Sequence, residues 1–175
     1  MALVALRLVS ALLLLRLLAG IIVSMNLIKI AKSACCLAVA CAGLASAQEG
    51  PQPKLPVTEL TLGIHRIQAE VAQTPAQQAI GMMFRREMGT NEAMLFVNED
   101  AGQRCFWMRN TLLPLSIAFI ADDGSIVNIA EMPPQSDQSH CSAKPVRYAL
   151  EMNRGWFSKR GFKAGDRLRG GPFGK

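Results

Sequence analysis

The chain has 175 residues, enough for one domain of ordinary size and an additional segment but too few for several large domains. Its formal net charge is +6, yet residues 1–47 contain no Asp or Glu, and from Gln48 onward 15 Lys and Arg stand against 13 Asp and Glu. The composition therefore excludes a strongly basic domain. No nucleic acid is expected as a partner, because no recognisable nucleic-acid-binding module is present.

The first 47 residues are typical of a leader for export. Met25–Lys32 is a positively charged start, Ser33–Gly43 is apolar, and Ala45-Ser46-Ala47 is the small-residue pattern that signal peptidase accepts. Cleavage near Ala47 would give a periplasmic or secreted protein, with membrane contact only through an uncleaved leader. Residues 1–24 are not needed for a signal peptide that begins at Met25. Either Met25 is the true start, which we favour, or the apolar segment anchors the protein in the inner membrane.

Residues 48–57 are rich in Pro and predict a flexible tether, followed by a single β-rich domain over residues 58–175. Apolar residues alternate from Leu60 to Ile64 and then, in the opposite phase, from Ile67 to Val71. This pattern predicts two short strands or one strand with a bulge. Thr74-Pro75-Ala76-Gln77 is a capping-box pattern, and we expect a helix from there to about Phe84.

The rest of the domain alternates short apolar runs with turn residues. We expect strands at residues 92–98, 105–108, 115–120, 125–130, 146–152 and 167–168. Ala121-Asp122-Asp123-Gly124 predicts a hairpin, and Asn153 predicts the cap of one helical turn that Gly161 closes. Many short strands with one or two short helices predict a mainly-β sandwich or barrel.

Two cysteines, Cys105 and Cys141, lie outside the predicted leader. An even pair in an exported protein most often forms a disulfide, and we predict one here. The alternatives are two free thiols, or a thiol at Cys141 that acts with the adjacent His140.

Five motifs follow one another along the domain. They are Gly81-Met-Met-Phe-Arg85, Met94-Leu-Phe96, Phe106-Trp-Met-Arg-Asn-Thr111, Pro114-Leu115 and Leu150-Glu-Met-Asn-Arg-Gly-Trp156. This set resembles the family called domain of unknown function (DUF) 192, over about Ile64 to Leu168. The resemblance implies a jelly-roll-like β sandwich but no reaction, because the family has no settled activity. Ser116 stands where the family more usually has Asp, so any chemistry of that carboxylate would be lost here.

The polar step Arg109-Asn110-Thr111 lies between two apolar runs and is the first candidate site. Arg109 could bind an anion, while Asn110 and Thr111 hydrogen-bond a ligand beside Phe106 and Trp107. The same residues could instead satisfy the backbone of a turn, with Asn110 in a left-handed conformation. We favour the turn.

Arg85, Ser116 and Glu151 complete the candidate ligand surface. Arg85 and Glu151 could form a buried ion pair, or both could line a cleft. No cofactor and no metal site is expected, because the sequence has no phosphate loop, dinucleotide fingerprint or zinc-protease helix, and its His and Cys residues lack metal-ligand spacing.

Two functions are compatible with these features. The first, which we favour, is a non-enzymatic binding or accessory module of the bacterial cell envelope, with a polar or anionic small molecule, a glycan or an envelope protein as partner. Nine basic residues between Lys144 and Lys175 would suit an anionic partner. The second is a small periplasmic enzyme, either a hydrolase with a pocket around Arg109, Asn110 and Glu151 or a thiol-dependent protein.

Overall fold

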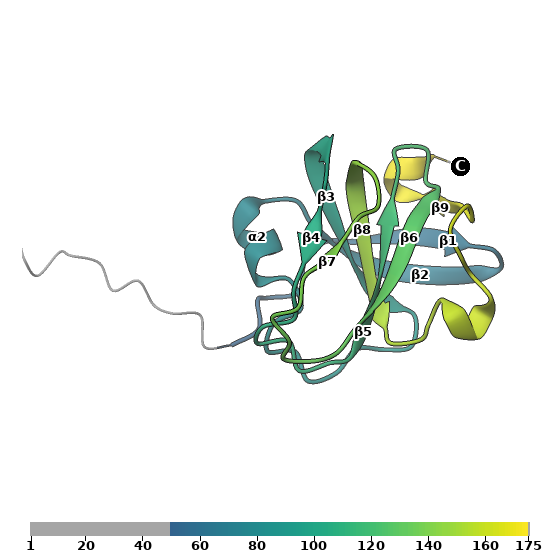
Figure 1. Cartoon of the computed structure of the whole chain (residues 1–175). Helices are drawn as coiled ribbons and strands as arrows, with labels where there is room; N and C mark the ends of the chain where they lie inside the picture. The colour runs from purple at the N-terminus through teal and green to yellow at the C-terminus, as the bar shows by residue number, and fades with distance from the viewer. Residues whose placement is uncertain (1–49, 175) are drawn as a thin grey trace, which may run out of the picture. The chain divides into compact units, whose positions relative to one another are not determined.

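The computed structural model describes residues 50–174 (Figure 1), and the predicted leader lies outside the described residues. The elements are β1 (Val57–Leu62), β2 (His65–Ala72), α2 (Pro75–Ile80), β3 (Glu92–Gly102), β4 (Cys105–Phe106), β5 (Leu115–Ile120), β6 (Ile126–Met132), β7 (His140–Cys141), β8 (Val146–Asn153), η1 (Ser158–Arg160), β9 (Leu168–Gly170) and η2 (Gly171–Phe173). Within residues 50–174, no helix is long and apolar enough to cross a bilayer.

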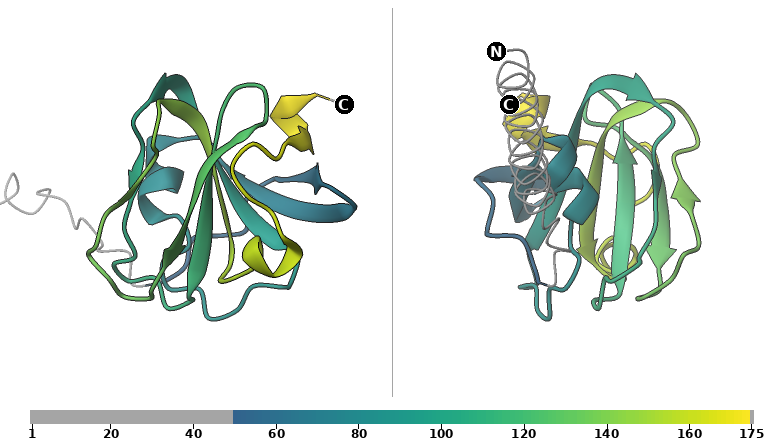
Figure 2. Two further views of the ribbon diagram at one scale, coloured as in Figure 1. Left: turned by 45° about the vertical axis from the view of Figure 1, so that its right-hand side comes forward. Right: turned by 90° about the vertical axis from the view of Figure 1, so that its left-hand side faces the viewer.

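The main sheet has seven strands in the order β6-β5-β8-β3-β2-β1-β9, and it curls until its two edges meet (Figure 2). All neighbouring strands are antiparallel except β2 and β3. At the edges, Ser125 bridges Arg167, and the Ile126 N–H donates to the Asp166 carbonyl at 2.8 Å. The predicted mainly-β, barrel-like fold is therefore confirmed, and the start of each edge strand finds backbone partners in the residues just before the other.

The two faces of the sheet serve two separate cores. Residues from all seven strands, such as Leu60, Leu95 and Leu150, meet in the inner core. The outer face of β3, β5 and β8 carries a second core that includes Met94 and Phe119. Consecutive strand residues point to opposite faces, so neighbours such as Met94 and Leu95 are buried in different cores. The second core is covered by the segment after α2 and by the small sheet of β4 and β7.

Three local predictions need correction. Ile64 is 93% exposed, because Gly63 takes a φ of 58° and turns the chain directly from β1 into β2. The helix ends at Ile80 instead of near Phe84, since Gly81 leaves the helical conformation. Asn153 does not cap a helix through its side chain; its Nδ2 donates instead to the carbonyls of residues 88 and 89.

The segment from Gly50 to Pro56 lacks regular secondary structure but is bound to the domain. Gln52 is buried and its Nε2 donates to the Gly81 carbonyl at 2.9 Å. The Leu55 N–H donates to Glu70 Oε2 at 2.9 Å. The prediction of a flexible tether is therefore corrected for the described part of residues 48–57, because polar side chains and backbone groups hold a segment that has few apolar groups to pack.

Cys105 and Cys141 lie directly opposite each other in β4 and β7, and their sulfur atoms are bonded. The pairing agrees with the predicted disulfide. The bond closes a loop with a sequence separation of 36 residues and joins the two strands of the small sheet.

We expect the double substitution Cys105→Ala/Cys141→Ala to lower the free energy of unfolding by about 3–4 kcal/mol, because the unfolded chain regains the freedom that the closed loop removes. Urea unfolding of the wild type and the double variant measures this change. Excess reductant should lower the free energy of unfolding of the wild-type protein by a similar amount. An unfolding midpoint that does not respond to reductant would contradict the prediction.

Candidate functional site

Glu151 lies in β8, the strand between β5 and β3, with its side chain on the outer face. Its register partners are Met94 in β3 and Ile117 in β5, which are both fully buried and apolar. Glu151 is 4% exposed, and its Oε2 has no hydrogen-bond partner among the described residues. Burial raises the pKa of Glu151 to about 8, so the carboxyl group is protonated at neutral pH.

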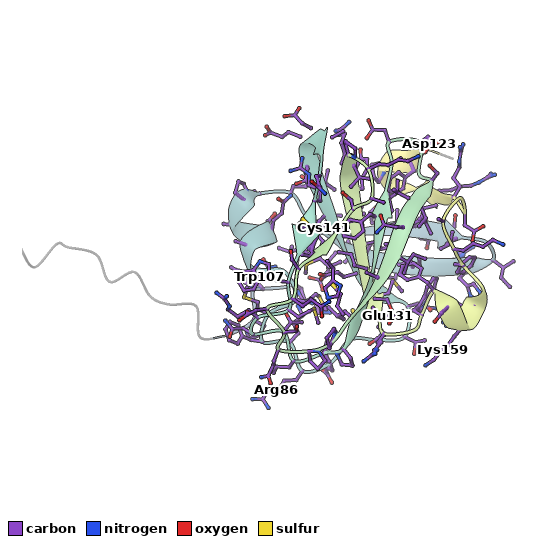
Figure 3. All side chains as sticks on the ribbon, in the orientation of Figure 1. Arg86, Trp107, Asp123, Glu131, Cys141 and Lys159 are labelled. Atoms are coloured by element: carbon purple, nitrogen blue, oxygen red, sulfur yellow. A yellow bond between two sulfur atoms is a disulfide. The ribbon has the colours of Figure 1, made fainter. Side chains whose placement is uncertain are left out.

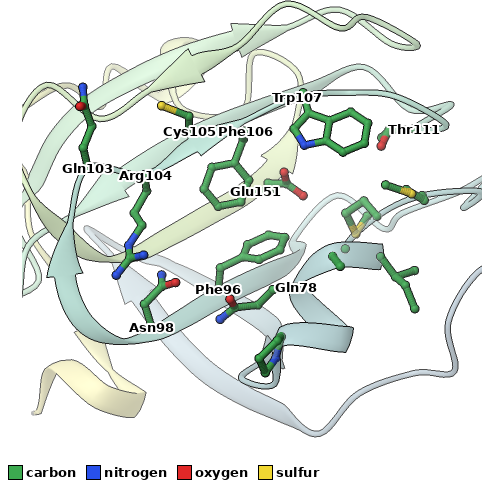
Figure 4. A pocket seen from close by; sticks show the side chains of 16 residues that line it. Gln78, Phe96, Asn98, Gln103, Arg104, Cys105, Phe106, Trp107, Thr111 and Glu151 are labelled. Carbon is green, nitrogen blue, oxygen red and sulfur yellow. The ribbon is translucent and has the colours of Figure 1, made fainter.

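An open cleft of about 560 Å³ lies over this carboxyl group, between α2 and β4. The aromatic rings of Phe96, Phe106 and Trp107 line it, and Thr111 lies at one end. Figure 4 shows the Glu151 carboxyl among the three rings, directed toward Trp107 and Thr111. The sequence predicted that Glu151 and Thr111 belong to one surface, and the structure brings both to this cleft.

Three polar side chains that line the cleft are engaged with the backbone. Gln78 Nε2 donates to the Val97 carbonyl at 2.7 Å, and Asn98 Nδ2 donates to the Arg147 carbonyl at 2.9 Å. The Arg104 guanidinium donates to the carbonyls of residues 100 and 146. These side chains fix the wall, whereas Oε2 of the buried Glu151 carboxyl has no hydrogen-bond partner among residues 50–174.

Strained backbone surrounds the turn that carries Thr111. Three non-glycine residues in the described part have positive φ: Phe84 at 62°, Asn110 at 58° and Gln135 at 54°. The Phe84 N–H donates to the Asn110 carbonyl at 2.8 Å, and the Gln135 N–H donates to the Thr111 carbonyl at 3.0 Å. Left-handed conformations are uncommon for such residues, and their meeting at one turn shows that this part of the cleft is held in a defined shape. The predicted left-handed turn at Asn110 is confirmed.

Arg109 lies outside the cleft and is mostly exposed. Its Cζ lies 4.5 Å from the centre of the Trp107 ring, and its Nε donates to Asp137 Oδ1 at 2.8 Å. Arg109 therefore covers the Trp107 ring that lines the cleft, with its charge matched by Asp137.

Arg85 pairs with Glu70 and not with Glu151, which corrects the first of the two alternatives considered for it. Arg85 Nη2 donates to Glu70 Oε2 at 2.7 Å, and Nη1 binds the other oxygen. Burial would raise the pKa of Glu70, but the hydrogen bonds from Arg85 and the Leu55 N–H, with the Arg85 charge, outweigh burial and lower that pKa. Arg85 lines a second, wider cleft of about 920 Å³ with Lys54 and Arg86.

Ser116 is fully buried on the opposite face from Glu151, because its register partner in β8 is Met152. Its Oγ donates to Glu131 Oε2 at 2.8 Å and accepts the Gly155 N–H at 2.8 Å. The structure therefore does not bring Ser116 to the cleft, and Figure 3 shows Glu131 and Trp107 well apart. Sequence reasoning missed Glu131, although its place at the end of a hairpin arm opposite Ser116 follows from the hairpin register.

Two further kinds of chemistry, a reactive thiol and a bound metal ion, were considered for the site. Cys141 is bonded to Cys105, which corrects the suggestion of a thiol acting with His140. Among residues 50–174, no group of three His, Cys, Asp or Glu side chains is placed to hold a metal ion.

We expect Asn110→Ala to lower the free energy of unfolding by about 1 kcal/mol, because Ala tolerates the left-handed conformation poorly. Asn110→Gly should stay within a few tenths of a kcal/mol of the wild type, since Gly adopts this conformation readily. Urea unfolding of both variants provides the measurement. Equal losses for Ala and Gly would show that the Asn side chain, and not the backbone conformation, is what matters at this position.

Comparison with known proteins places this chain in a family. The model of the DUF192 family, described as "Uncharacterized ACR, COG1430", matches residues 58–170. No curated protein matches the chain.

Two solved structures are similar over most of their own length. A protein from Sinorhizobium meliloti 1021, described as a "putative transcription regulator", has 35% sequence identity and a TM-score of 0.67, over 69% of this chain and 98% of that one. A protein of unknown function from Novosphingobium aromaticivorans DSM 12444 has 35% identity and a TM-score of 0.64, over 70% and 93% of the two chains. Because the matched residues span nearly the whole described domain, the chain belongs to the DUF192 family.

Proposed function

We propose that this protein is a non-enzymatic ligand-binding module of the bacterial cell envelope, and that the cleft over Glu151 is its binding site. The observation that carries the proposal is the Glu151 carboxyl group at an open aromatic cleft; it is 4% exposed, and its Oε2 has no hydrogen-bond partner within residues 50–174. A buried polar group without a partner destabilises the fold, so its presence at a cleft favours a role in binding.

The residues expected to form a ligand surface divide into three groups. Glu151 and Thr111 line the cleft, whereas Arg109 and Asn110 shape its wall through the Trp107 ring and the strained turn. Arg85 lies in the second cleft, where Glu70 neutralises it, and Ser116 lies on the other face of the sheet. The cleft over Glu151 is favoured because Oε2 of its carboxyl group has no hydrogen-bond partner in the part of the chain that the structure describes.

The envelope location rests on the leader pattern before Gln48 and on the Cys105–Cys141 pair, which is typical of oxidising compartments. A small periplasmic enzyme is the second candidate, because a carboxyl group with a pKa of about 8 could act as a general acid at neutral pH. Among the described residues that line the cleft, Arg104 is the other charged group, and no nucleophile with an adjacent base accompanies Glu151. Binding is therefore preferred to catalysis.

A thermal-shift screen with neutral, anionic and cationic small molecules tests the proposal. A ligand that occupies the cleft raises the unfolding temperature, and a concentration of 100 times Kd stabilises the folded state by about 2.7 kcal/mol. Glu151→Gln should lose the response, whereas Glu59→Gln, which alters an exposed carboxylate on β1, should retain it. Compounds that stabilise the wild type and Glu151→Gln equally would contradict a site at this cleft.

A further inference from the structure

Glu151 restricts the chemistry of any ligand that reaches the floor of the cleft. As a protonated acid it can donate one hydrogen bond, whereas as a carboxylate it can hold a cation. An anion could accept that hydrogen bond from the protonated acid, and would hold the acid in its neutral form. The acid therefore admits either a hydrogen-bond acceptor or a cation, and the lining of the cleft decides between them.

The lining of the cleft favours the cation. Phe96, Phe106 and Trp107 offer aromatic surface around the carboxyl group, and aromatic faces attract ammonium and guanidinium groups. Trp107 already carries the Arg109 guanidinium at 4.5 Å from its ring centre, which shows that this indole accepts a cation. An acid surrounded by rings matches an organic cation better than it matches a neutral polar group.

The cationic side chains near the cleft do not pair with the Glu151 carboxyl group. Arg104 donates to the carbonyls of residues 100 and 146, and Figure 4 shows its guanidinium beside Asn98, with Phe96 and Phe106 between it and Glu151 in this view. Arg109 is paired with Asp137. Among the other elements near Glu151, β5 is uncharged, Arg85 after α2 is neutralised by Glu70, and the carboxylates of β3 do not line the cleft.

We infer that the cleft binds an organic cation, with an ammonium group that pairs with Glu151 and an apolar body that packs against Phe96, Phe106 and Trp107. This inference rests on the proposed function and names its ligand class. A cavity of about 560 Å³ has room for a small amine with one aromatic ring.

Ion pairing with an ammonium group requires the carboxylate form of Glu151. Because the pKa of Glu151 is raised to about 8, the free site holds a proton at neutral pH, and that proton leaves to solvent when the cation binds. The affinity should therefore rise about tenfold for each pH unit between about pH 6 and pH 8, and then level off. A neutral ligand that accepts a hydrogen bond from the protonated acid would bind with almost constant affinity up to about pH 8 and more weakly above it.

Three probes with the same aromatic body and different charge test the inference: benzylammonium, benzyl alcohol and benzoate. Isothermal titration of the exported protein in two buffers of different ionisation enthalpy measures both the affinity and the number of protons released. We expect benzylammonium to bind most tightly, with close to one proton released at pH 7 and an affinity that rises toward pH 8. Glu151→Gln should weaken benzylammonium at least about tenfold, whereas Glu59→Gln should leave it unchanged.

Benzyl alcohol that binds as tightly as benzylammonium, or benzylammonium that binds without proton release, would overturn the inference while leaving a ligand site in place. Absence of benzylammonium binding at millimolar concentration would also overturn it. The proposed function fails separately, when no compound of any charge distinguishes the wild type from Glu151→Gln in the thermal-shift screen.

Discussion

Replacing Glu151 by Gln should remove a loss of stability that the wild-type protein undergoes as the pH rises from about 4.5 to about 8. The pKa of Glu151 is about 8 in the folded state against 4.5 for an unperturbed Glu, because burial disfavours the charged form. Between these values the unfolded state releases the proton and the folded state keeps it. Stability from this group is therefore full below about pH 4.5, falls as the pH rises, and levels off above about pH 8.

The size of the effect follows from the shift in pKa. Each pH unit in this interval changes the free energy of unfolding by about 1.4 kcal/mol, which amounts to about 5 kcal/mol over the whole range. Urea unfolding of the wild type and Glu151→Gln at several pH values measures the difference. The variant should be the more stable protein at pH 8, and its advantage should shrink toward pH 4.5. Parallel pH profiles for the two proteins would show that Glu151 is not buried as a protonated acid.

A carboxyl group that destabilises its own fold at neutral pH has no structural benefit in the described domain. Gln or an apolar residue would fill the same position in β8 at lower cost, since the neighbours Met94 and Ile117 are apolar. Such a residue is expected where a ligand supplies the missing partner. The cleft over Glu151 is consistent with that role.

Breaking the buried pair of Arg85 and Glu70 should have the second large effect. Glu70→Met leaves the Arg85 side chain, which is 9% exposed in the wild type, without its counter-charge, and the expected loss is about 3–5 kcal/mol. The double variant Glu70→Met/Arg85→Met should lose less than the single variant, because no buried charge is then left unpaired. Urea unfolding of the two variants gives both values.

The exposed pair of Arg109 and Asp137 is the matched control. Its Nε–Oδ1 distance is 2.8 Å, but its side chains are 60% and 70% exposed, so Asp137→Ala should cost no more than about 1 kcal/mol. A Glu70→Met variant no less stable than Asp137→Ala would contradict the assignment of Arg85 and Glu70 as a buried structural clamp. The lowered pKa of Glu70 also makes the stability depend on pH: the contribution of Glu70 is present above about pH 4.5 and is lost as the pH falls through its folded-state pKa.

Local signals in the sequence predicted local structure well. The Thr74 capping box is present, with the Gln77 N–H donating to Thr74 Oγ1 at 3.2 Å and the Thr74 N–H donating to Gln77 Oε1 at 3.0 Å. The Asp-Asp-Gly turn joins β5 to β6 as expected, and the Cys pair is bonded. Each of these features depends on residues close in sequence or on a choice among very few partners.

The composition of the site could not be predicted in the same way. Glu70 lies in β2, and its partner Arg85 lies in the connection that leads from β2 to the parallel strand β3; no local pattern specifies that this connection brings the two together. Glu151 Oε2 lacks a hydrogen-bond partner among the described residues because of the way segments distant in sequence, including α2 and β4, pack around it. The separation of Ser116 from Glu151 follows from strand register, in which a shift of one residue reverses the face of the sheet.

The protonation state of Glu151 is the most direct test of this account. Carbon-13 NMR of the Glu carboxyl groups, assigned by comparison with Glu151→Gln, follows the titration of this one group in the folded protein. We expect the Glu151 signal to be that of a protonated acid at neutral pH and to titrate near pH 8. Addition of benzylammonium should move that titration toward lower pH. A Glu151 signal that titrates near 4.5, the value for an unperturbed Glu, would contradict the account.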